Sequence, residues 1–200
     1  MWVNYFVERD KRCAIKDGKL CITAGVAKRN LRTGCNKLLP ASKRSNKEIR
    51  MSYTNLIYHI IFRTRKSVDA ISVEHENFLY RYIWGIVKGK GGVFYRVGGM
   101  PDHIHLCVQL PSTLAVADFM RDLKTSTSKF ISTKKDLFPK FDGWGKSYCA
   151  LTYSNSEKGS IVEYIKNQKV HHKTGAFPDE LRSILQENGI VYSEEFFMKE

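Results

Sequence analysis

Hydrophobic and polar residues follow a regular pattern only from about residue 52 onward. Runs rich in β-branched and aromatic residues predict four strands, at 55–62, 93–97, 104–109 and 144–154. Apolar residues spaced three and four apart predict four helices, at 73–88, 114–132, 155–173 and 179–187. The pattern therefore indicates a mixed structure in which strands and helices are interspersed.

The order of these elements is strand, helix, strand, strand, helix, strand, helix, helix. With so few strands, the economical fold is α+β, a ferredoxin-like split βαβ sandwich with an antiparallel central sheet. The strand at 104–109 would then be central, and we expect the helices to cover one face of the sheet.

Residues 1–50 differ from the rest because no periodic apolar face persists in them. They hold 13 Lys and Arg against 4 Asp and Glu. One interpretation is a basic arm that contacts nucleic acid; the other is a poorly ordered extension, even one translated from upstream of the true start. The clean pattern that begins at Met51 favours the second. We therefore expect an N-terminal extension at 1–50 and one domain at 51–200.

The net charge of +13 and the pI near 9.5 favour a polyanionic partner, nucleic acid first and a membrane surface second. Five cysteines are an odd number without CxxC spacing, which argues against a zinc ribbon and a disulfide framework. No apolar run approaches the roughly 18 residues of a membrane span, and charged residues interrupt the N-terminus where a signal peptide would be apolar. We expect a cytoplasmic protein with no membrane partner.

Two histidines one residue apart lie in the strand at 104–109 and just before it. Side chains at i and i+2 of a strand share a face, so His103 and His105 project together while Ile104 faces the core. Paired imidazoles are ready ligands for a divalent metal. The alternative is a strand with two partly exposed histidines. His59, in the first strand, we expect to be a core histidine and not a ligand.

Tyr164 and Gln168 are four residues apart, so one face of a continuous helix would carry both. A surface tyrosine is the ordinary interpretation of Tyr164 alone. Packed against His103 and His105, however, this face would complete a phosphoryl-transfer site. Two imidazoles and the Gln168 amide oxygen would hold the metal, and the tyrosine hydroxyl would be the nucleophile.

Basic side chains near these elements are candidate contacts to DNA phosphate. They are Arg63, Arg65 and Lys66 after the first strand, Arg121, Lys124 and Lys129 on the helix at 114–132, and Lys169 beside Gln168. The basic side chains on the helix at 114–132 are donors suited to a nucleic-acid backbone. The equal alternative is that this helix face is simply exposed to solvent.

Four motifs carry a resemblance to a known family. They are Tyr-His-Ile-Ile-Phe at 58–62, Pro-Asp-His-Ile-His-Leu at 101–106, Trp-Gly-Lys-Ser-Tyr-Cys-Ala at 144–150 and Ile-Val-Glu-Tyr-Ile-Lys-Asn-Gln at 161–168. In this order and spacing the chain from Met51 to Glu200 resembles the single-tyrosine HUH transposases of the insertion sequence 200/605 family, especially the REP-associated tyrosine transposases. Lys146 and Ser147 depart from the Gln and Gly that many relatives carry there.

The resemblance implies an HUH endonuclease fold with His103 and His105 as metal ligands, Gln168 as the third ligand and Tyr164 as the nucleophile. It also implies a Mg²⁺ or Mn²⁺ cofactor and cleavage of single-stranded DNA beside hairpins through a 5′-phosphotyrosine intermediate. Such proteins usually form homodimers, and this one would be a bacterial protein located at the nucleoid when bound to DNA.

Three functions fit these features. The first is a DNA transposase, and the second is a domesticated nuclease that cleaves chromosomal hairpin repeats. The third is a hairpin-binding protein without catalysis, which the presence of Tyr164, both histidines and Gln168 argues against.

Overall fold

The computed structural model describes residues 53–171, 177–194 and 197 of the chain. The expected extension at 1–50 lies outside these residues, as does its boundary with the domain. Within the described part, no helix is long and apolar enough to cross a membrane.

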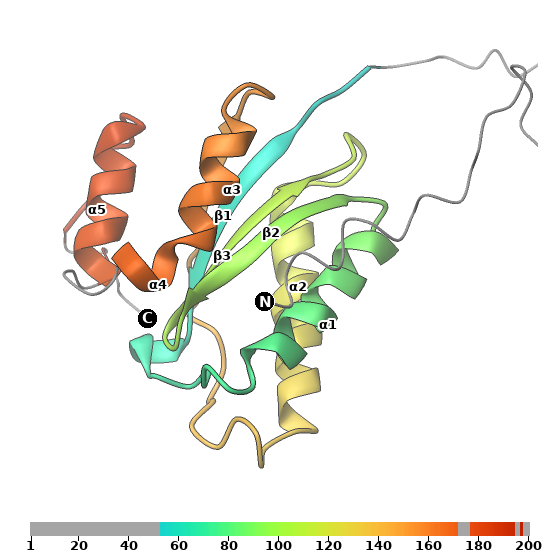
Figure 1. The fold of residues 1–200 in the computed structure, drawn as a ribbon, viewed down its shortest axis with the longest axis vertical. Coiled ribbons are helices and arrows are strands. Elements are labelled where there is room, and N and C mark those ends of the chain that lie inside the picture. Colours follow the sequence, from blue (N-terminus) through green and yellow to red (C-terminus); the bar gives the residue numbers. More distant parts are fainter. Residues whose placement is uncertain (1–52, 172–176, 195–196, 198–200) are drawn as a thin grey trace, which may run out of the picture. The chain divides into compact units, whose positions relative to one another are not determined.

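The elements follow the predicted order from β1 to α5 (Figure 1). The strands are β1 (Ile57–Arg63), β2 (Val93–Met100), β3 (His103–Gln109) and β4 (Cys149–Tyr153). The helices are α1 (Glu76–Gly89), α2 (Val116–Ser132), α3 (Lys158–Lys166), α4 (Gln168–His171) and α5 (Phe177–Glu187), with one 3₁₀ turn, η2 (Arg65–Ser67). The last strand is shorter than predicted, since Trp144 forms only an isolated bridge with Thr64.

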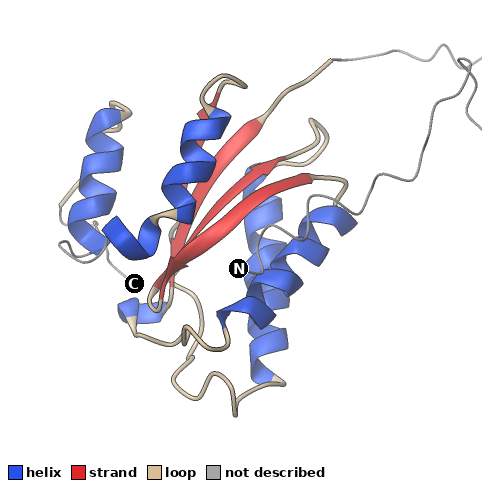
Figure 2. Cartoon of the chain, in the orientation of Figure 1, coloured by secondary structure: helices blue, strands red, loops and turns tan. Residues whose placement is uncertain are grey.

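The four strands form one antiparallel sheet in the order β2-β3-β1-β4. Together with the chain order β1-α1-β2-β3-α2-β4, this is the ferredoxin-like topology. Figure 2 draws the strands in red and the helices in blue. The α+β fold class is confirmed, and β3 is a central strand as expected.

The expectation that helices cover only one face of the sheet is wrong. Helices α1 and α2 pack on one face, where the core contains Ile60, Ile104 and Leu106. Helices α3 and α5 cover the other face, over Ile61 and Cys107 (Figure 1). The central strands β1 and β3 are apolar or buried at nearly every position, so both of their faces need cover.

The single helix predicted at 155–173 is also wrong. It is divided at Asn167 (φ −92°, ψ 8°), which separates α3 from α4. Tyr164 therefore lies on α3 and Gln168 begins α4. Any meeting of the two side chains depends on how the two helices pack and not on the spacing of one continuous helix.

Candidate active site

Strand β3 presents His103 and His105 to the face covered by α3, α4 and α5. Both side chains are fully buried, while Ile104 and Leu106 between and beyond them enter the core on the other face. The antiparallel register places Arg63 opposite His103 and Ile61 opposite His105. The alternation predicted for this strand is confirmed, but the histidines are not exposed.

Each imidazole is oriented through its Nδ1 atom. His103 Nδ1 lies 2.7 Å from Asp102 Oδ1, and His105 Nδ1 lies 2.9 Å from His59 Nε2. Burial, and then the neighbouring His105, lower the pKa of His59 to about 3, so His59 is neutral near pH 7. His59 is buried as expected, and it also has the role of fixing a neighbouring imidazole. Such partners hold the ring so that Nε2 can bind a metal.

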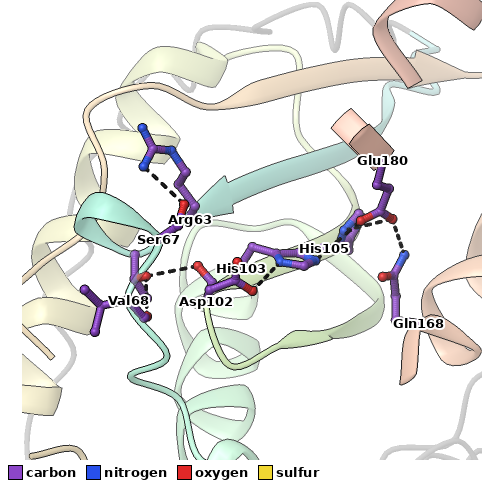
Figure 3. A network of polar contacts seen from close by, with 9 residues as sticks. Arg63, Ser67, Val68, Asp102, His103, His105, Gln168 and Glu180 are labelled. Carbon is purple, nitrogen blue, oxygen red and sulfur yellow. Dashed lines mark hydrogen bonds and ion pairs between the residues drawn. The ribbon is translucent and has the colours of Figure 1, made fainter. Parts of the chain in front are cut away.

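Glu180 on α5 faces both Nε2 atoms (Figure 3). Its carboxylate oxygens lie 3.6 Å from His103 Nε2 and 3.5 Å from His105 Nε2. Burial opposes ionisation of this carboxyl, but hydrogen bonds and charge from His105, with hydrogen bonds from Tyr164 and Gln168, outweigh it and lower the pKa of Glu180. Glu180 is thus a carboxylate at the centre of the cluster.

Tyr164 and Gln168 converge on the same carboxylate. The Tyr164 hydroxyl and the Gln168 side-chain amide both donate to Glu180 Oε1, the amide at 2.9 Å (Figure 3 shows the amide contact). The Tyr164 ring lies edge-on to His105, with centroids 5.9 Å apart. Burial, and then the hydrogen bond to Glu180, raise the pKa of Tyr164, so its proton stays on the hydroxyl near neutral pH.

These side chains fit a divalent metal ion. One ligand atom from each of His103, His105 and Glu180 can lie within 4.8 Å of the other two. The Gln168 side-chain oxygen is buried without a hydrogen-bond partner among the described residues, and a buried polar atom of this kind is costly unless something binds it. Imidazole nitrogen with carboxylate and amide oxygen is a ligand set that Mg²⁺, Mn²⁺ and later transition metals all accept.

Sequence reasoning missed Glu180. The residue lies on an amphipathic helix where an acidic side chain is ordinarily solvated, and no short-range spacing connects it to the two histidines. Only the packing of α5 against the sheet brings it there.

Gly98 on β2 lets α3 approach the sheet. A Cβ atom at this position would lie 2.7 Å from the carbonyl oxygen of Ile165, the residue after Tyr164. Because Gly98 is the partner of His105 in the β2–β3 ladder, this close approach is at the level of the site. On the far side of the site, the Phe177 ring stacks on His103 with centroids 4.1 Å apart.

The candidate DNA contacts have diverse surroundings. Arg63 is buried and donates to Ser67 Oγ at 3.3 Å (Figure 3). Arg65 pairs with Asp142 at 3.2 Å, and Arg121 with Asp118 at 2.7 Å. Lys169 forms an ion pair with Glu76. The side chains of Lys66 and Lys129 are exposed.

Lys124 is occupied by the protein itself. Its ammonium donates to the carbonyl oxygens of Gly145, Lys146 and Ser147 at 2.8, 3.2 and 2.8 Å. Lys124 therefore holds the loop that leads into β4.

Known proteins are similar to this chain over somewhat more than half of its length. The chain is 29% identical over 117 residues to the ISDra2 transposase TnpA of Deinococcus radiodurans, which is 56% of this chain and 84% of that relative. A crystal structure described as that of a transposase from Deinococcus radiodurans R1 is 28% identical, covers 61% of this chain and 97% of its own, and superposes with a TM-score of 0.48. A solved structure of a REP-associated tyrosine transposase bound to a REP hairpin is 16% identical to this chain. It covers 62% of this chain and 73% of its own chain, with a TM-score of 0.47.

Residues 52–168 match the family model described as Transposase IS200 like, and the match ends at Gln168. This stretch contains both histidines and Tyr164. The chain belongs to the IS200-like transposase family.

Proposed function

We propose that this transposase cleaves and rejoins single-stranded DNA with Tyr164 as its nucleophile, in a reaction that depends on a divalent metal. The observation that carries the proposal is the convergence of Tyr164, Gln168 and both β3 histidines on Glu180. Four elements, β3, α3, α4 and α5, contribute to this one polar cluster.

His103, His105 and the Gln168 side-chain oxygen would hold the metal, with Glu180 as a further ligand. When bound, a Mg²⁺ or Mn²⁺ ion supplies positive charge that offsets the negative charge developing on a phosphate in the transition state. The Asp102 and His59 contacts to the two Nδ1 atoms favour this arrangement, because they leave each Nε2 directed to the cluster.

Tyr164 Oη would attack the scissile phosphorus. A bond forms between this oxygen and phosphorus, and the bond from phosphorus to the 3′-oxygen breaks. The leaving oxygen takes up, by way of Glu180, the proton that Tyr164 gives up and becomes a 3′-hydroxyl. The phenolic proton passes to Glu180 Oε1, to which the hydroxyl already donates. The resulting 5′-phosphotyrosine conserves the energy of the phosphodiester, so attack by a 3′-hydroxyl reverses the step and rejoins DNA.

The substrate would be single-stranded DNA beside a hairpin. This part rests on the resemblance of the four sequence motifs, and the net charge of +13 supports a nucleic-acid partner. We also propose that the protein is a homodimer. Light scattering coupled to size-exclusion chromatography measures its mass in solution directly.

The proposal is tested by incubating labelled single-stranded oligonucleotides from the DNA flanking the gene with protein and Mn²⁺, then separating the products on a denaturing gel. We expect a covalent protein–DNA adduct that Tyr164→Phe abolishes and EDTA prevents. Tyr153→Phe, on β4 of the same sheet, is the matched control. An adduct that persists in Tyr164→Phe would disprove the nucleophile, and one that persists in EDTA would disprove the metal requirement. Hairpin binding with no adduct from any strand would instead support the non-catalytic function.

A further inference from the structure

A second feature adjoins the site. A hollow of about 330 Å³ lies where β1 ends and β4 begins, bordered by α5 and the segment that follows it. Its lining includes Arg63, Tyr148, Phe177, Leu181 and Tyr192, and we name it the Tyr148 pocket. A volume of this size is in the range of small-ligand sites.

The Tyr148 pocket and the candidate active site share a wall. The Phe177 ring lines the pocket and also stacks on His103. Arg63 and Ile61 line it as well, and they are the ladder partners of His103 and His105. The pocket therefore lies next to the imidazoles, and the Phe177 ring forms part of the wall between them.

The chemistry of the lining suits a nucleobase. Tyr148, Phe177 and Tyr192 contribute aromatic rings, and stacking on such rings binds unpaired bases with little regard to sequence. Arg63 adds a basic residue to the lining. Tyr148 remains 38% exposed despite its aromatic ring, which leaves ring surface for a partner.

Tyr148 is held in place by the loop that precedes it. Lys124 binds the three carbonyl groups of residues 145–147, and its ammonium lies 5.6 Å from the centroid of the Tyr148 ring. The cation thus fixes both the loop and the ring. A ring that is ordered before binding loses less entropy when a base stacks on it.

We propose that the Tyr148 pocket receives the base of one unpaired nucleotide next to the scissile phosphate. The inference rests on the proposed function, because it assumes that a DNA strand crosses the face with His103 and His105. Lys124 acts as a positioning residue for this pocket, not as a contact to DNA phosphate.

The test measures binding without cleavage. In full-length Tyr164→Phe protein, we would determine the affinity for the tightest-binding flanking oligonucleotide and for copies with a single abasic site at each position. One abasic position should lower affinity about five- to hundredfold, as expected for loss of one stacked base. In the double variant Tyr164→Phe with Tyr148→Ala, affinity for the intact strand should fall by a similar factor. The same abasic site should then lower the affinity of the double variant little further.

Two variants separate stacking from other effects. Tyr148→Phe keeps the ring and should bind as Tyr164→Phe alone. Phe78→Ala removes an exposed aromatic from α1, on the opposite face of the sheet, and should leave the abasic profile unchanged. Should Tyr148→Ala not fold, as judged by circular dichroism, Leu181→Trp fills the pocket and should produce the same loss of sensitivity.

The outcomes distinguish the two proposals. The proposal for the Tyr148 pocket is overturned, and the proposed function stays intact, if a Tyr164-dependent adduct forms but no abasic position lowers the affinity. The same conclusion follows if one abasic position lowers the affinity but Tyr148→Ala and Leu181→Trp do not change that loss. If one abasic position and Tyr148 are coupled but the wild-type protein forms no adduct, the result supports the pocket and overturns the proposed function. Failure of every flanking strand to bind overturns both.

Discussion

The carboxylate of Glu180 receives hydrogen bonds from two side chains and faces two imidazoles. Replacing Glu180 with Gln keeps its size and removes its charge. We expect Mn²⁺ affinity to fall by about 10- to 100-fold, the range seen when groups around a metal site are replaced. Isothermal titration calorimetry measures this without any DNA.

The control for this change is Glu187→Gln, which alters an exposed carboxylate on the same helix. It should leave the Mn²⁺ affinity unchanged. Equal affinity in Glu180→Gln and wild type would mean that Glu180 is not a ligand and serves only to hold Tyr164 and Gln168.

At the scale of elements, the approach of α3 to β2 positions the Tyr164 hydroxyl. Gly98→Ala would place a methyl group against the Ile165 carbonyl, so α3 must shift away from the sheet. We expect the free energy of unfolding to fall by about 1–3 kcal/mol, as for other overpacked sites, and the rate of adduct formation to fall as well. Chemical denaturation and the adduct gel measure the two effects.

Gly85→Ala is the matched control for Gly98→Ala. Nothing lies within 4 Å of a Cβ built at Gly85, which is in the exposed part of α1. This change should stabilise the protein by up to about 1 kcal/mol because alanine favours the helix. Wild-type adduct formation in Gly98→Ala would show that the position of α3 is less constrained than its packing indicates.

The ion pair between Lys169 and Glu76 connects two helices on opposite faces of the sheet. Lys169 follows Gln168 on α4, and Glu76 begins α1. We expect Lys169→Glu to lower adduct formation by freeing α4, and the charge swap with Glu76→Lys to restore part of it. Hydrogen exchange of the α4 amides, faster in the single variant than in the swap, reports the same effect without DNA.

A different result would assign Lys169 to DNA, as the sequence suggested. In that case Lys169→Glu lowers DNA affinity, and Glu76→Lys does not restore it. The charge swap thus decides between a structural role and a phosphate contact.

At the scale of the whole molecule, the positive charge is concentrated at the N-terminus. Residues 1–50 hold 13 Lys and Arg against 4 Asp and Glu, and residues 51–200 hold 20 against 16. Deleting residues 1–50 should therefore reduce the slope of log affinity against log salt for non-specific DNA, because fewer counterions are released. Fluorescence anisotropy at several salt concentrations measures that slope.

The same deletion should leave Tyr164-dependent adduct formation in place, since the family match begins at residue 52. A truncated protein that folds but forms no adduct would show that the first 50 residues take part in cleavage. It would then favour the basic arm over the extension.

Much of this fold could be predicted because its signals are local. Runs rich in β-branched and aromatic residues place β1 and β3, and three- and four-residue spacing places α1 and α2 close to their observed bounds. The break at Asn167 could not be predicted, because the sequence there has neither proline nor glycine. The helical layer formed by α3 and α5 was not predicted, although β1 and β3 are apolar or buried on both faces and such strands need cover on both sides.

The sequence by itself determined that His103 and His105 share one face, because the period of a strand is two residues. It also determined the order of strands and helices, and with it the ferredoxin-like topology. Tertiary structure alone decided that Tyr164, Gln168 and Glu180 meet those histidines, since the three come from separate helices whose packing depends on shape across the sheet. A carboxylate such as Glu180 becomes part of a site only when folding removes it from water and gives it partners.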